Sequence, residues 1–247
     1  MKEGIFKFKK FEVSHNRSAM KVGVDGVLIG AWGEAGSDTE GPCRILDIGT
    51  GCGVMALMVA QKNSEARFTA VEIDRESAAE ALSNFHNSPW GDRISLVEGD
   101  ISQIVENNDY QDSFDYIISN PPFFSSGISS PTTPREKARH EGSLSPEGVL
   151  MAASRLLRKG GKVSLIFPVT IEREMIKAAE QLGLKPLRIC KVADSPKKSF
   201  KRIMLCCVKD FGPLSDGEEI ETLYMRDLDG EYSEAYKILT KEFYLNF

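Results

Sequence analysis

The sequence predicts a doubly wound α/β fold, with a mostly parallel seven-stranded sheet and helices on both faces. Short apolar runs alternate with amphipathic segments along most of the chain, and several runs end in glycine, aspartate or asparagine. This alternation is typical of right-handed βαβ crossovers, which place successive strands in one parallel sheet. Strands are expected at 44–48, 67–73, 93–97, 114–118, 162–167, 184–192 and 202–208, and helices at 54–61, 77–86, 146–157 and 170–182.

Three segments are expected to pack as one unit. Residues 1–34 would form an N-terminal arm and a short capped helix, residues 35–210 the main ligand-binding domain, and residues 211–247 an acidic strand and helix. The arm carries Phe6, Phe8, Phe11 and Val13, for which core packing is the default interpretation and base stacking the alternative. We expect Gly160-Gly161 to end the helix that precedes the fifth strand.

The composition is that of a soluble globular protein, with 41% hydrophobic and 27% charged residues. No apolar run approaches the roughly 18 residues that a membrane span requires, and no signal peptide is evident. The five cysteines include no Cys-x-x-Cys pair and the three histidines are remote from one another, so no metal site is expected. Reduced thiols agree with a cytoplasmic protein.

Charge is distributed unevenly along the chain, although the net charge is only −5. Residues 1–21 contain six basic and two acidic side chains, and residues 185–209 contain eight basic and one acidic. Residues 210–247 contain three basic and ten acidic side chains. The basic segments indicate a local surface for a polyanion, and the alternative is a solvated charged face.

A rigid turn, Ser119-Asn120-Pro121-Pro122-Phe123, follows the fourth strand. Two consecutive prolines lack N–H donors and restrict the backbone, so the strand must end here. In open α/β sheets this edge is where ligands bind. The Asn120 side-chain oxygen and the Pro121 carbonyl could accept hydrogen bonds from one exocyclic amine, and Phe123 could stack on a planar group. An ordinary structural turn is the alternative.

A glycine-rich turn, Asp47 to Gly53, joins the first strand to its helix. Glycines at such a turn let the backbone approach a ligand closely, although a simple tight turn is the alternative. Glu72 follows about 20 residues later, where an acidic side chain binds ribose in nucleoside-binding α/β folds. Asp100 could accept a hydrogen bond from an adenine amine or could simply cap the next helix.

Other candidate contacts flank these turns. Asp25 is a good N-cap for a short apolar helix whose free N–H groups, with Lys21, could face a ligand carboxylate; a plain capped helix is the alternative. A long polar loop between 125 and 146 and a connector between the last two strands carry basic residues suited to phosphate contact. These residues are Arg135, Lys137, Arg139, Lys197, Lys198 and Lys201.

These motifs resemble those of class I S-adenosylmethionine-dependent methyltransferases that modify exocyclic or amide nitrogens. The bacterial tRNA1(Val) (adenine(37)-N6)-methyltransferase family is the more similar group. The resemblance covers almost the whole chain and includes the Asn-Pro-Pro-Phe motif, where tyrosine is commoner than Phe123. Supporting stretches are Lys21-Val22-Gly23 through Ala31-Trp32, Asn87-Ser88-Pro89-Trp90, Pro134-Arg135-Glu136 with Ala138-Arg139, and Tyr232-Ser233-Glu234-Ala235-Tyr236.

The resemblance implies a Rossmann-like methyltransferase fold and S-adenosylmethionine as the cofactor. Gly49 and Gly51 would hold its methionine part, Glu72 its ribose and Asp100 its adenine. Asn120 and Pro121 would hold the target N6 amine, and Phe123 would stack on the base. The full set of expected cofactor contacts is Lys21, Asp25, Asp47, Gly49, Gly51, Gly53, Glu72, Asp100 and Asn120.

The partner implied by the resemblance is the anticodon loop of tRNA1(Val), methylated at adenine 37. Two enzymatic alternatives use the same motif, on a protein glutamine or on a guanine N2 in rRNA. An NAD-dependent oxidoreductase and a non-catalytic tRNA-binding protein are further alternatives. The Gly-x-Gly-x-Gly spacing counts against the first of these, and the intact Asn-Pro-Pro-Phe turn against the second.

Overall fold

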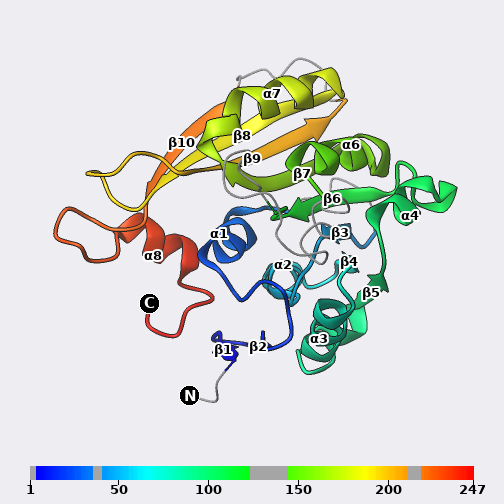
Figure 1. Cartoon of the computed structure of the whole chain (residues 1–247), viewed down its shortest axis with the longest axis horizontal. Coiled ribbons are helices and arrows are strands. Elements are labelled where there is room, and N and C mark those ends of the chain that lie inside the picture. The colour runs from blue at the N-terminus through cyan, green and yellow to red at the C-terminus, as the bar shows by residue number, and fades with distance from the viewer. Residues whose placement is uncertain (1–3, 36–40, 123–143, 211–217) are drawn as a thin grey trace, which may run out of the picture.

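A computed structural model describes residues 4–35, 41–122, 144–210 and 218–247 of this chain. Its centre is an eight-stranded sheet in the order β10-β8-β9-β7-β6-β3-β4-β5 (Figure 1). Neighbouring strands are parallel except that β9 is antiparallel to β7 and β8. The strands are β3 (Arg44–Ile48), β4 (Arg67–Glu72), β5 (Ile94–Glu98), β6 (Phe114–Ser119), β7 (Leu157–Pro168), β8 (Leu184–Ala193), β9 (Arg202–Lys209) and β10 (Glu219–Tyr224).

The expected α/β class and mostly parallel sheet are confirmed, but the number of strands is not. Seven strands were predicted for the sheet, and the structure has eight because β10 from the acidic tail pairs with β8 in parallel. Without β10, the backbone N–H and C=O groups along one side of β8 would form an open sheet edge. The tail therefore extends the sheet itself.

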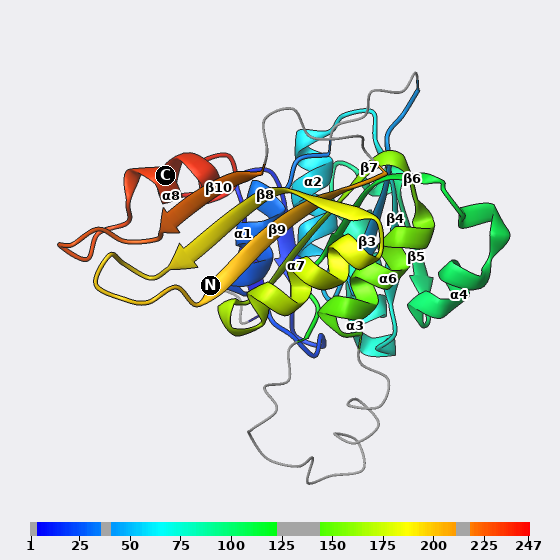
Figure 2. The same cartoon turned by 90° about the horizontal axis from the view of Figure 1, so that it is seen from above.

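Helices cover both faces of the sheet. One face carries α1 (Val24–Trp32), α2 (Val54–Lys62), α3 (Arg75–His86) and α8 (Glu234–Thr240). The other carries α4 (Ile101–Glu106), α6 (Pro146–Leu156) and α7 (Glu172–Gln181), of which α6 and α7 lie over the sheet in Figure 2. Short 3-10 turns occur at η1 (Gly91–Arg93), η2 (Asn108–Tyr110) and η3 (Val169–Ile171). Every residue of β6 is buried, as expected for a strand covered on both faces.

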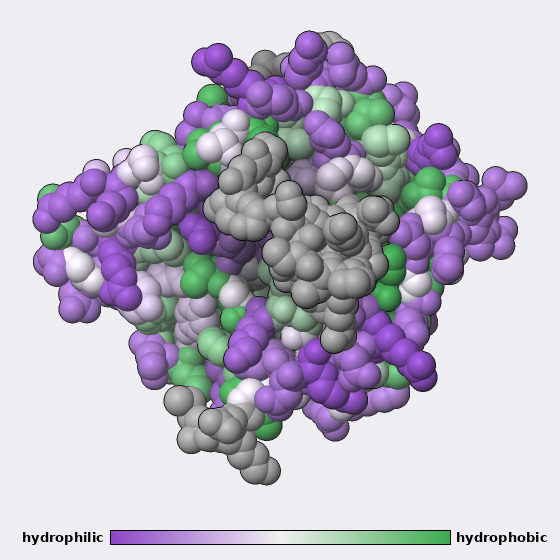
Figure 3. Space-filling model, viewed as in Figure 1, coloured by the Kyte–Doolittle hydropathy of each residue, from purple (hydrophilic) through white to green (hydrophobic). Residues whose placement is uncertain are grey.

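The N-terminal arm is a small antiparallel hairpin, β1 (Ile5–Lys7) with β2 (Glu12–Ser14). Phe8 and Phe11 are buried with their ring centroids 4.5 Å apart, and Val13 is fully buried, so the core-packing interpretation holds. The Lys9 amide donates to the carbonyl of Phe243 at 2.8 Å, which joins the hairpin to the C-terminal segment. No described helix is long and apolar enough to cross a membrane. Apolar residues on the face in Figure 3 lie in small patches among hydrophilic ones.

Two local expectations are wrong. The helix α6 ends at Leu156, before Gly160-Gly161, and β7 begins at once and contains both glycines. A β-carbon at Gly161 would lie 3.0 Å from the Phe114 carbonyl oxygen, and the β6–β7 register is irregular beside Phe114. Gly161 therefore permits close backbone approach at a bulge, and Gly160 supplies a positive φ of +78°; sequence alone did not distinguish this arrangement from a helix end.

The second wrong expectation is the cap of α1. Gly23 occupies the N-cap position and provides no side-chain hydrogen bond, whereas Asp25 lies within the first turn. The Asp25 carboxylate forms an ion pair with Arg202 at the start of β9. A carboxylate is favourable in the first turn of a helix, and here a long-range cation partner adds to that effect.

Gly53 is expected to be essential for packing the start of α2. Its φ is +87°, and an added β-carbon would lie 2.5 Å from Cε1 of Phe85 in α3. We expect Gly53→Ala to lower the free energy of unfolding by about 2 kcal/mol or more, from backbone strain and overpacking together. Urea denaturation measures this change.

Gly160→Ala is the matched control for that substitution. Gly160 has a φ of +78°, but its added β-carbon would meet no atom within 4 Å. It should lose only the backbone term, about 1 kcal/mol. Equal losses in the two variants would mean that the Phe85 contact does not restrict residue 53.

Candidate active site

The carboxyl ends of the central parallel strands lie at one level of the sheet. Ile48 of β3 lies opposite Val71 of β4 and Ser119 of β6, and the Ser119 hydroxyl donates to the Ile48 carbonyl at 2.7 Å. The next residues along these three strands are Gly49, Glu72 and Asn120. Neighbouring strands are about 4.8 Å apart, so this edge gathers the three residues within roughly 10 Å.

The glycine turn has open space beside Gly49 and Gly51. Gly49 and Gly51 have φ values of +71° and +57°, and a β-carbon at either would meet no atom within 4 Å. Their backbone is therefore accessible to a ligand in the described structure. Gly53 differs, because the Phe85 ring already fills the space beside it. Gly53 shapes the turn and the start of α2, although the sequence analysis grouped it with the ligand contacts.

Asp47 is fully buried beneath this turn. Its Oδ2 atom accepts hydrogen bonds from the Thr50 hydroxyl at 2.6 Å and the Ala56 amide at 3.1 Å. Its Oδ1 atom is buried and has no hydrogen-bond partner among the described residues. Burial raises the pKa of Asp47 to about 7, against the lowering effect of those two hydrogen bonds. The Oδ2 atom thus stabilises the turn, and the Oδ1 atom has no donor among the described residues.

Glu72 connects the end of β4 to the same turn. Its Oε2 accepts from the Gly51 amide at 2.8 Å, and its Oε1 accepts from the Asp74 amide at 2.8 Å. Burial raises the pKa of Glu72, and these amides oppose that effect. Each carboxylate oxygen has a further lone pair, so Glu72 can still accept hydrogen bonds from hydroxyl groups.

A small hollow of about 40 Å³ adjoins Glu72, and its lining also includes Gly49, Gly99 and Asp100. The Asp100 carboxylate caps α4 by accepting from the Ser102 amide at 2.8 Å. The capping role proposed for Asp100 is therefore confirmed, and its position beside the hollow is compatible with a ligand contact as well. Leu144, which also lines the hollow, carried no signal in the sequence because it follows a long polar loop.

Asn120 leaves β6 with its side-chain oxygen unpartnered. The Oδ1 atom is buried and has no hydrogen-bond partner among the described residues, and Pro121 next to it is buried. A buried amide oxygen without a donor costs free energy, so this atom is a candidate acceptor for a ligand donor. Phe123, Arg135, Lys137 and Arg139 lie outside the described residues.

Of the two predicted ligand contacts near α1, Lys21 is exposed and Asp25 already has an ion-pair partner. The Lys21 side chain is exposed, as its expected role at a ligand carboxylate requires. Asp25 is paired with Arg202, and burial raises the pKa of Asp25 against the lowering effect of that guanidinium. Arg202 lies in the basic stretch after β8, and nothing in its local sequence indicated a partner near α1. Only the pairing of β9 with β7, which sets Arg202 opposite Pro168, brings it to this edge.

The basic connector after β8 is partly engaged within the protein. Lys201 pairs with Asp194 at 2.7 Å, and Lys197 donates to the Leu228 carbonyl at 3.1 Å. Lys198 is exposed. The connector is thus a folded part of the β8–β9 hairpin, and two of its three predicted phosphate-binding lysines already have partners.

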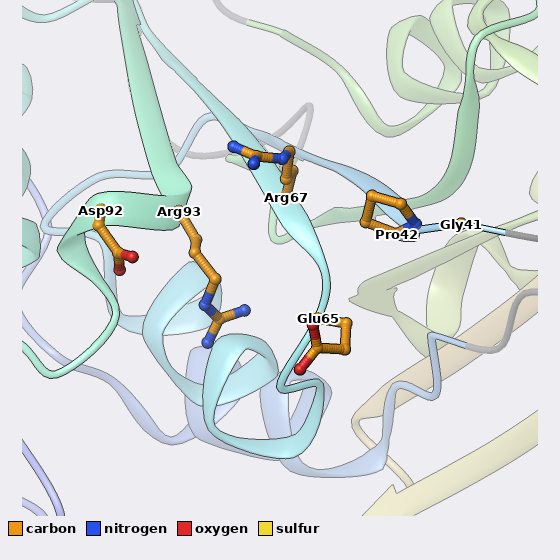
Figure 4. A pocket seen from close by; sticks show the side chains of 6 residues that line it. All are labelled: Gly41, Pro42, Glu65, Arg67, Asp92 and Arg93. Atoms are coloured by element: carbon orange, nitrogen blue, oxygen red, sulfur yellow. The ribbon is translucent and has the colours of Figure 1, made fainter.

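A larger pocket, of about 500 Å³, lies at the opposite edge of the sheet. It is lined by Gly41, Pro42, Glu65, Arg67, Asp92 and Arg93 (Figure 4). The Arg93 guanidinium donates to the Asn63 and Ala66 carbonyls, both at 2.8 Å, so it closes the loop after α2. This pocket has mixed charges and adjoins the amino ends of the parallel strands, whereas ligands of open α/β sheets bind at the carboxyl ends. The candidate active site is therefore the edge with Asn120.

Comparisons with known proteins agree with this fold. Residues 38–181 match the methyltransferase small domain family. A solved structure of a predicted O-methyltransferase, Atu636 from Agrobacterium tumefaciens, superimposes with a TM-score of 0.67. It is 21% identical and covers 89% of this chain and 96% of its own. This likeness shows the class I methyltransferase fold.

Curated relatives match over their full lengths. A protein of Bacteroides thetaiotaomicron is 39% identical, over 100% of this chain and 99% of its own. One of Yersinia enterocolitica is 36% identical, over 100% and 95%. Both are named tRNA1(Val) (adenine(37)-N6)-methyltransferase. With the glycine turn, Glu72 and the Asn-Pro-Pro turn at one edge of the sheet, the chain belongs to the tRNA1(Val) (adenine(37)-N6)-methyltransferase family.

Proposed function

We propose that this protein transfers a methyl group from S-adenosylmethionine to the exocyclic N6 of adenine 37 in tRNA1(Val), beside the anticodon. The names of the relatives support the substrate. The observation that carries the chemistry is the buried, unpartnered Asn120 Oδ1 atom one residue beyond β6. Asn120 follows Ser119, which lies opposite Ile48 in the glycine turn.

The residues of this edge fit the cofactor. Gly49 and Gly51 leave space where side chains would otherwise lie, and the unpartnered Asp47 Oδ1 is suited to a positively charged amino group. Glu72 retains lone pairs for ribose hydroxyls, and Asp100 adjoins the same hollow, where it would meet the adenine amine. S-adenosylmethionine would supply an electrophilic methyl group on a sulfonium.

The Asn120-Pro121 turn would activate the target amine. The lone pair of an aromatic amine is delocalised into its ring, which makes the nitrogen a poor nucleophile. Two acceptors, Asn120 Oδ1 and the Pro121 carbonyl, would draw the nitrogen toward a tetrahedral shape. They would also stabilise the positive charge that develops on it. The amine proton would then pass to solvent, and no strong base is required.

The prolines make this arrangement rigid before the substrate binds. Pro121 and Pro122 restrict the backbone, and the Ser119 hydroxyl joins the end of β6 to β3. Little reorganisation is then needed in the reaction, which is the condition for electrostatic stabilisation and for proximity to contribute fully. Phe123 directly follows this rigid part and is proposed to stack on the base.

The target base must leave its stack to reach this edge. Anticodon-loop bases are unpaired, so extruding one costs little. Lys198, with Arg135, Lys137 and Arg139, is proposed to contact the tRNA backbone, with Lys197 and Lys201 contributing if they exchange their present partners. A tRNA substrate agrees with a cytoplasmic enzyme. Labelled-methyl transfer to tRNA from a strain without this protein, followed by mapping of the product, tests the assignment against protein glutamine and rRNA guanine.

Asn120→Ala should lower the turnover number by about 10²-fold or more, because one preorganised charge-stabilising acceptor is lost. The affinity for S-adenosylhomocysteine, measured by calorimetry, should change little. Asn108→Ala removes an exposed carboxamide far from this edge and serves as the control. Turnover in Asn120→Ala close to that of Asn108→Ala would exclude Asn120 from the mechanism.

Asp47→Asn should change how stability depends on pH in the free protein. The pKa of Asp47 is raised by burial from 3.8 to about 7, so between about pH 4 and pH 7 the folded chain holds a proton that the unfolded chain has released. The free energy of unfolding of the wild type should therefore fall as pH rises through this window. The variant cannot ionise at residue 47 and lacks this term.

Urea denaturation at pH 4.5, 6 and 7.5 measures the difference between the two proteins. The stability of Asp47→Asn relative to wild type should rise steadily over that series. Asp92→Asn, which neutralises an exposed carboxylate, controls for net charge. If the stabilities of wild type and Asp47→Asn run parallel with pH, the buried carboxyl does not carry a raised pKa.

A further inference from the structure

One face of α3 is polar although it is buried. Ser77, Glu80 and Asn84 are only 2%, 1% and 4% exposed, and they follow one another at intervals of three and four residues. Such spacing places side chains on one side of a helix. The apolar stripe of α3, with Ala81 and Phe85, packs in the core. The polar stripe must therefore serve a different partner.

That partner is the segment of residues 14–18, which begins at the last residue of β2. Glu80 Oε1 accepts from the Ser14 hydroxyl and the Asn16 amide, both at 2.8 Å, and from the Arg17 amide at 3.2 Å. Glu80 Oε2 accepts from the Ser18 amide and hydroxyl, both at 2.7 Å, and from the Arg17 amide at 3.1 Å. Burial opposes the charge, but these hydrogen bonds outweigh it and lower the pKa of Glu80 to about 2. A single ionised carboxylate thus holds the whole segment.

Asn84 joins the same segment to the glycine turn. Its Oδ1 accepts from the Ser14 amide at 2.9 Å, while its Nδ2 donates to the carbonyls of Ser14 and Cys52, both at 2.8 Å. Cys52 belongs to the glycine turn of the candidate active site. The segment is therefore fixed relative to the turn proposed to hold the cofactor.

The segment continues as a closed loop. The Ala19 amide donates to the Ser77 hydroxyl at 3.1 Å, beside the start of α3, and the Val22 amide donates to His15 Nδ1 at 3.0 Å. We refer to residues 14–22 as the rim loop. It runs from the glycine turn past the first residues of α3, and both of these adjoin the carboxyl edge of the sheet.

The rim loop presents a cation and an apolar side chain to solvent. Arg17 is exposed and its guanidinium forms no ion pair with the described residues, since only its backbone amide contacts Glu80. Met20 is 54% exposed. Lys201 and Lys197 of the β8–β9 connector, by contrast, already have partners within the protein. The backbone of Arg17 is thus fixed by its hydrogen bonds to Glu80, while its guanidinium has no ion-pair partner among the described residues.

We propose that Arg17 binds a phosphate of the tRNA backbone and that Glu80 is the positioning residue that sets the rim loop at the mouth of the active site. This inference rests on the proposed function, since it names where that substrate is held. Burying a carboxylate costs desolvation free energy, and a protein with apolar residues in place of such a group is often equally stable. A charged acceptor, however, makes stronger hydrogen bonds than a neutral one, and the Glu80 carboxylate accepts from the three consecutive amides of residues 16–18.

The first test removes the cation. Arg17→Ala should weaken tRNA binding severalfold at 0.1 M salt and reduce the slope of log affinity against log salt by about 0.7 to 0.9, the value for one lost phosphate contact. Arg17→Lys keeps the charge and should retain the slope. Arg67→Ala removes an exposed arginine at the opposite edge of the sheet (Figure 4) and should leave both quantities unchanged. An Arg17→Ala slope equal to that of Arg67→Ala would overturn the proposal.

The second test separates positioning from charge. Glu80→Gln removes a negative charge, so general electrostatics predicts tighter binding of a polyanion. Loss of the held loop predicts weaker binding, and faster hydrogen exchange of the amides of residues 16–18. Glu76→Gln, an exposed carboxylate on the same helix, is the matched control. Cooperative thermal unfolding and S-adenosylhomocysteine binding verify the fold of each variant, and tighter binding by folded Glu80→Gln would refute the positioning role.

A third comparison keeps this proposal apart from the proposed function. Wild-type protein is assayed for methyl transfer to the same tRNA. If wild type methylates adenine 37 and the Arg17 variants bind tRNA like wild type, the inference about Arg17 fails while the function stands. If wild type transfers no methyl group to tRNA, the proposed function fails and the inference that rests on it fails too. If Glu80→Gln does not fold, the Arg17 series still decides the phosphate contact.

Discussion

The active site depends on the register of β6, β3 and β4, which brings the carboxyl ends of the three strands to the same height of the sheet. Because Ile48 lies opposite both Val71 and Ser119, the next residue of each strand emerges at the same height of the sheet. Side chains of neighbouring strands alternate between faces, and a shift of one residue would turn each to the other face. Both faces of these strands are buried, so such a shift would expose apolar side chains. The packing of the core therefore also keeps Gly49, Glu72 and Asn120 in line.

Two buried acceptors at this edge have no hydrogen-bond donor among the described residues, and the proposed function gives each of them one. The Oδ1 atoms of Asp47 and Asn120 are both buried without a donor among the described residues. Each lowers the stability of the free protein, because a buried acceptor loses its hydrogen bond to water and gains none within the protein. In the proposed function the first is satisfied by the cofactor and the second by the substrate amine. The free energy lost in folding is then partly recovered on binding.

The same edge shows two uses of a carboxylate. Glu72 and Glu80 both accept from backbone amides, but Glu72 keeps its place in the lining of the hollow and Glu80 is covered by the rim loop. Their pKa values move in opposite directions for this reason. Burial dominates at Glu72 and raises its pKa, whereas the many donors around Glu80 dominate and lower it. One carboxylate is thus available to a ligand, and the other is part of the framework.

The sequence by itself determined most local features of this protein, apart from the end of α6 and the cap of α1. Apolar runs identified the main strands to within one or two residues, except that β7 begins five residues before its predicted start. The prolines after Asn120 and the glycines after Asp47 identified the turns, because these residues restrict or free the backbone wherever they occur. Only the tertiary structure decided the contacts between distant segments. The Asp25–Arg202 pair, the carboxylate of Glu80 over residues 14–18 and the pairing of β10 with β8 each join parts far apart in the chain. Such contacts depend on which strands become neighbours, and periodicity within one segment contains no information about that choice.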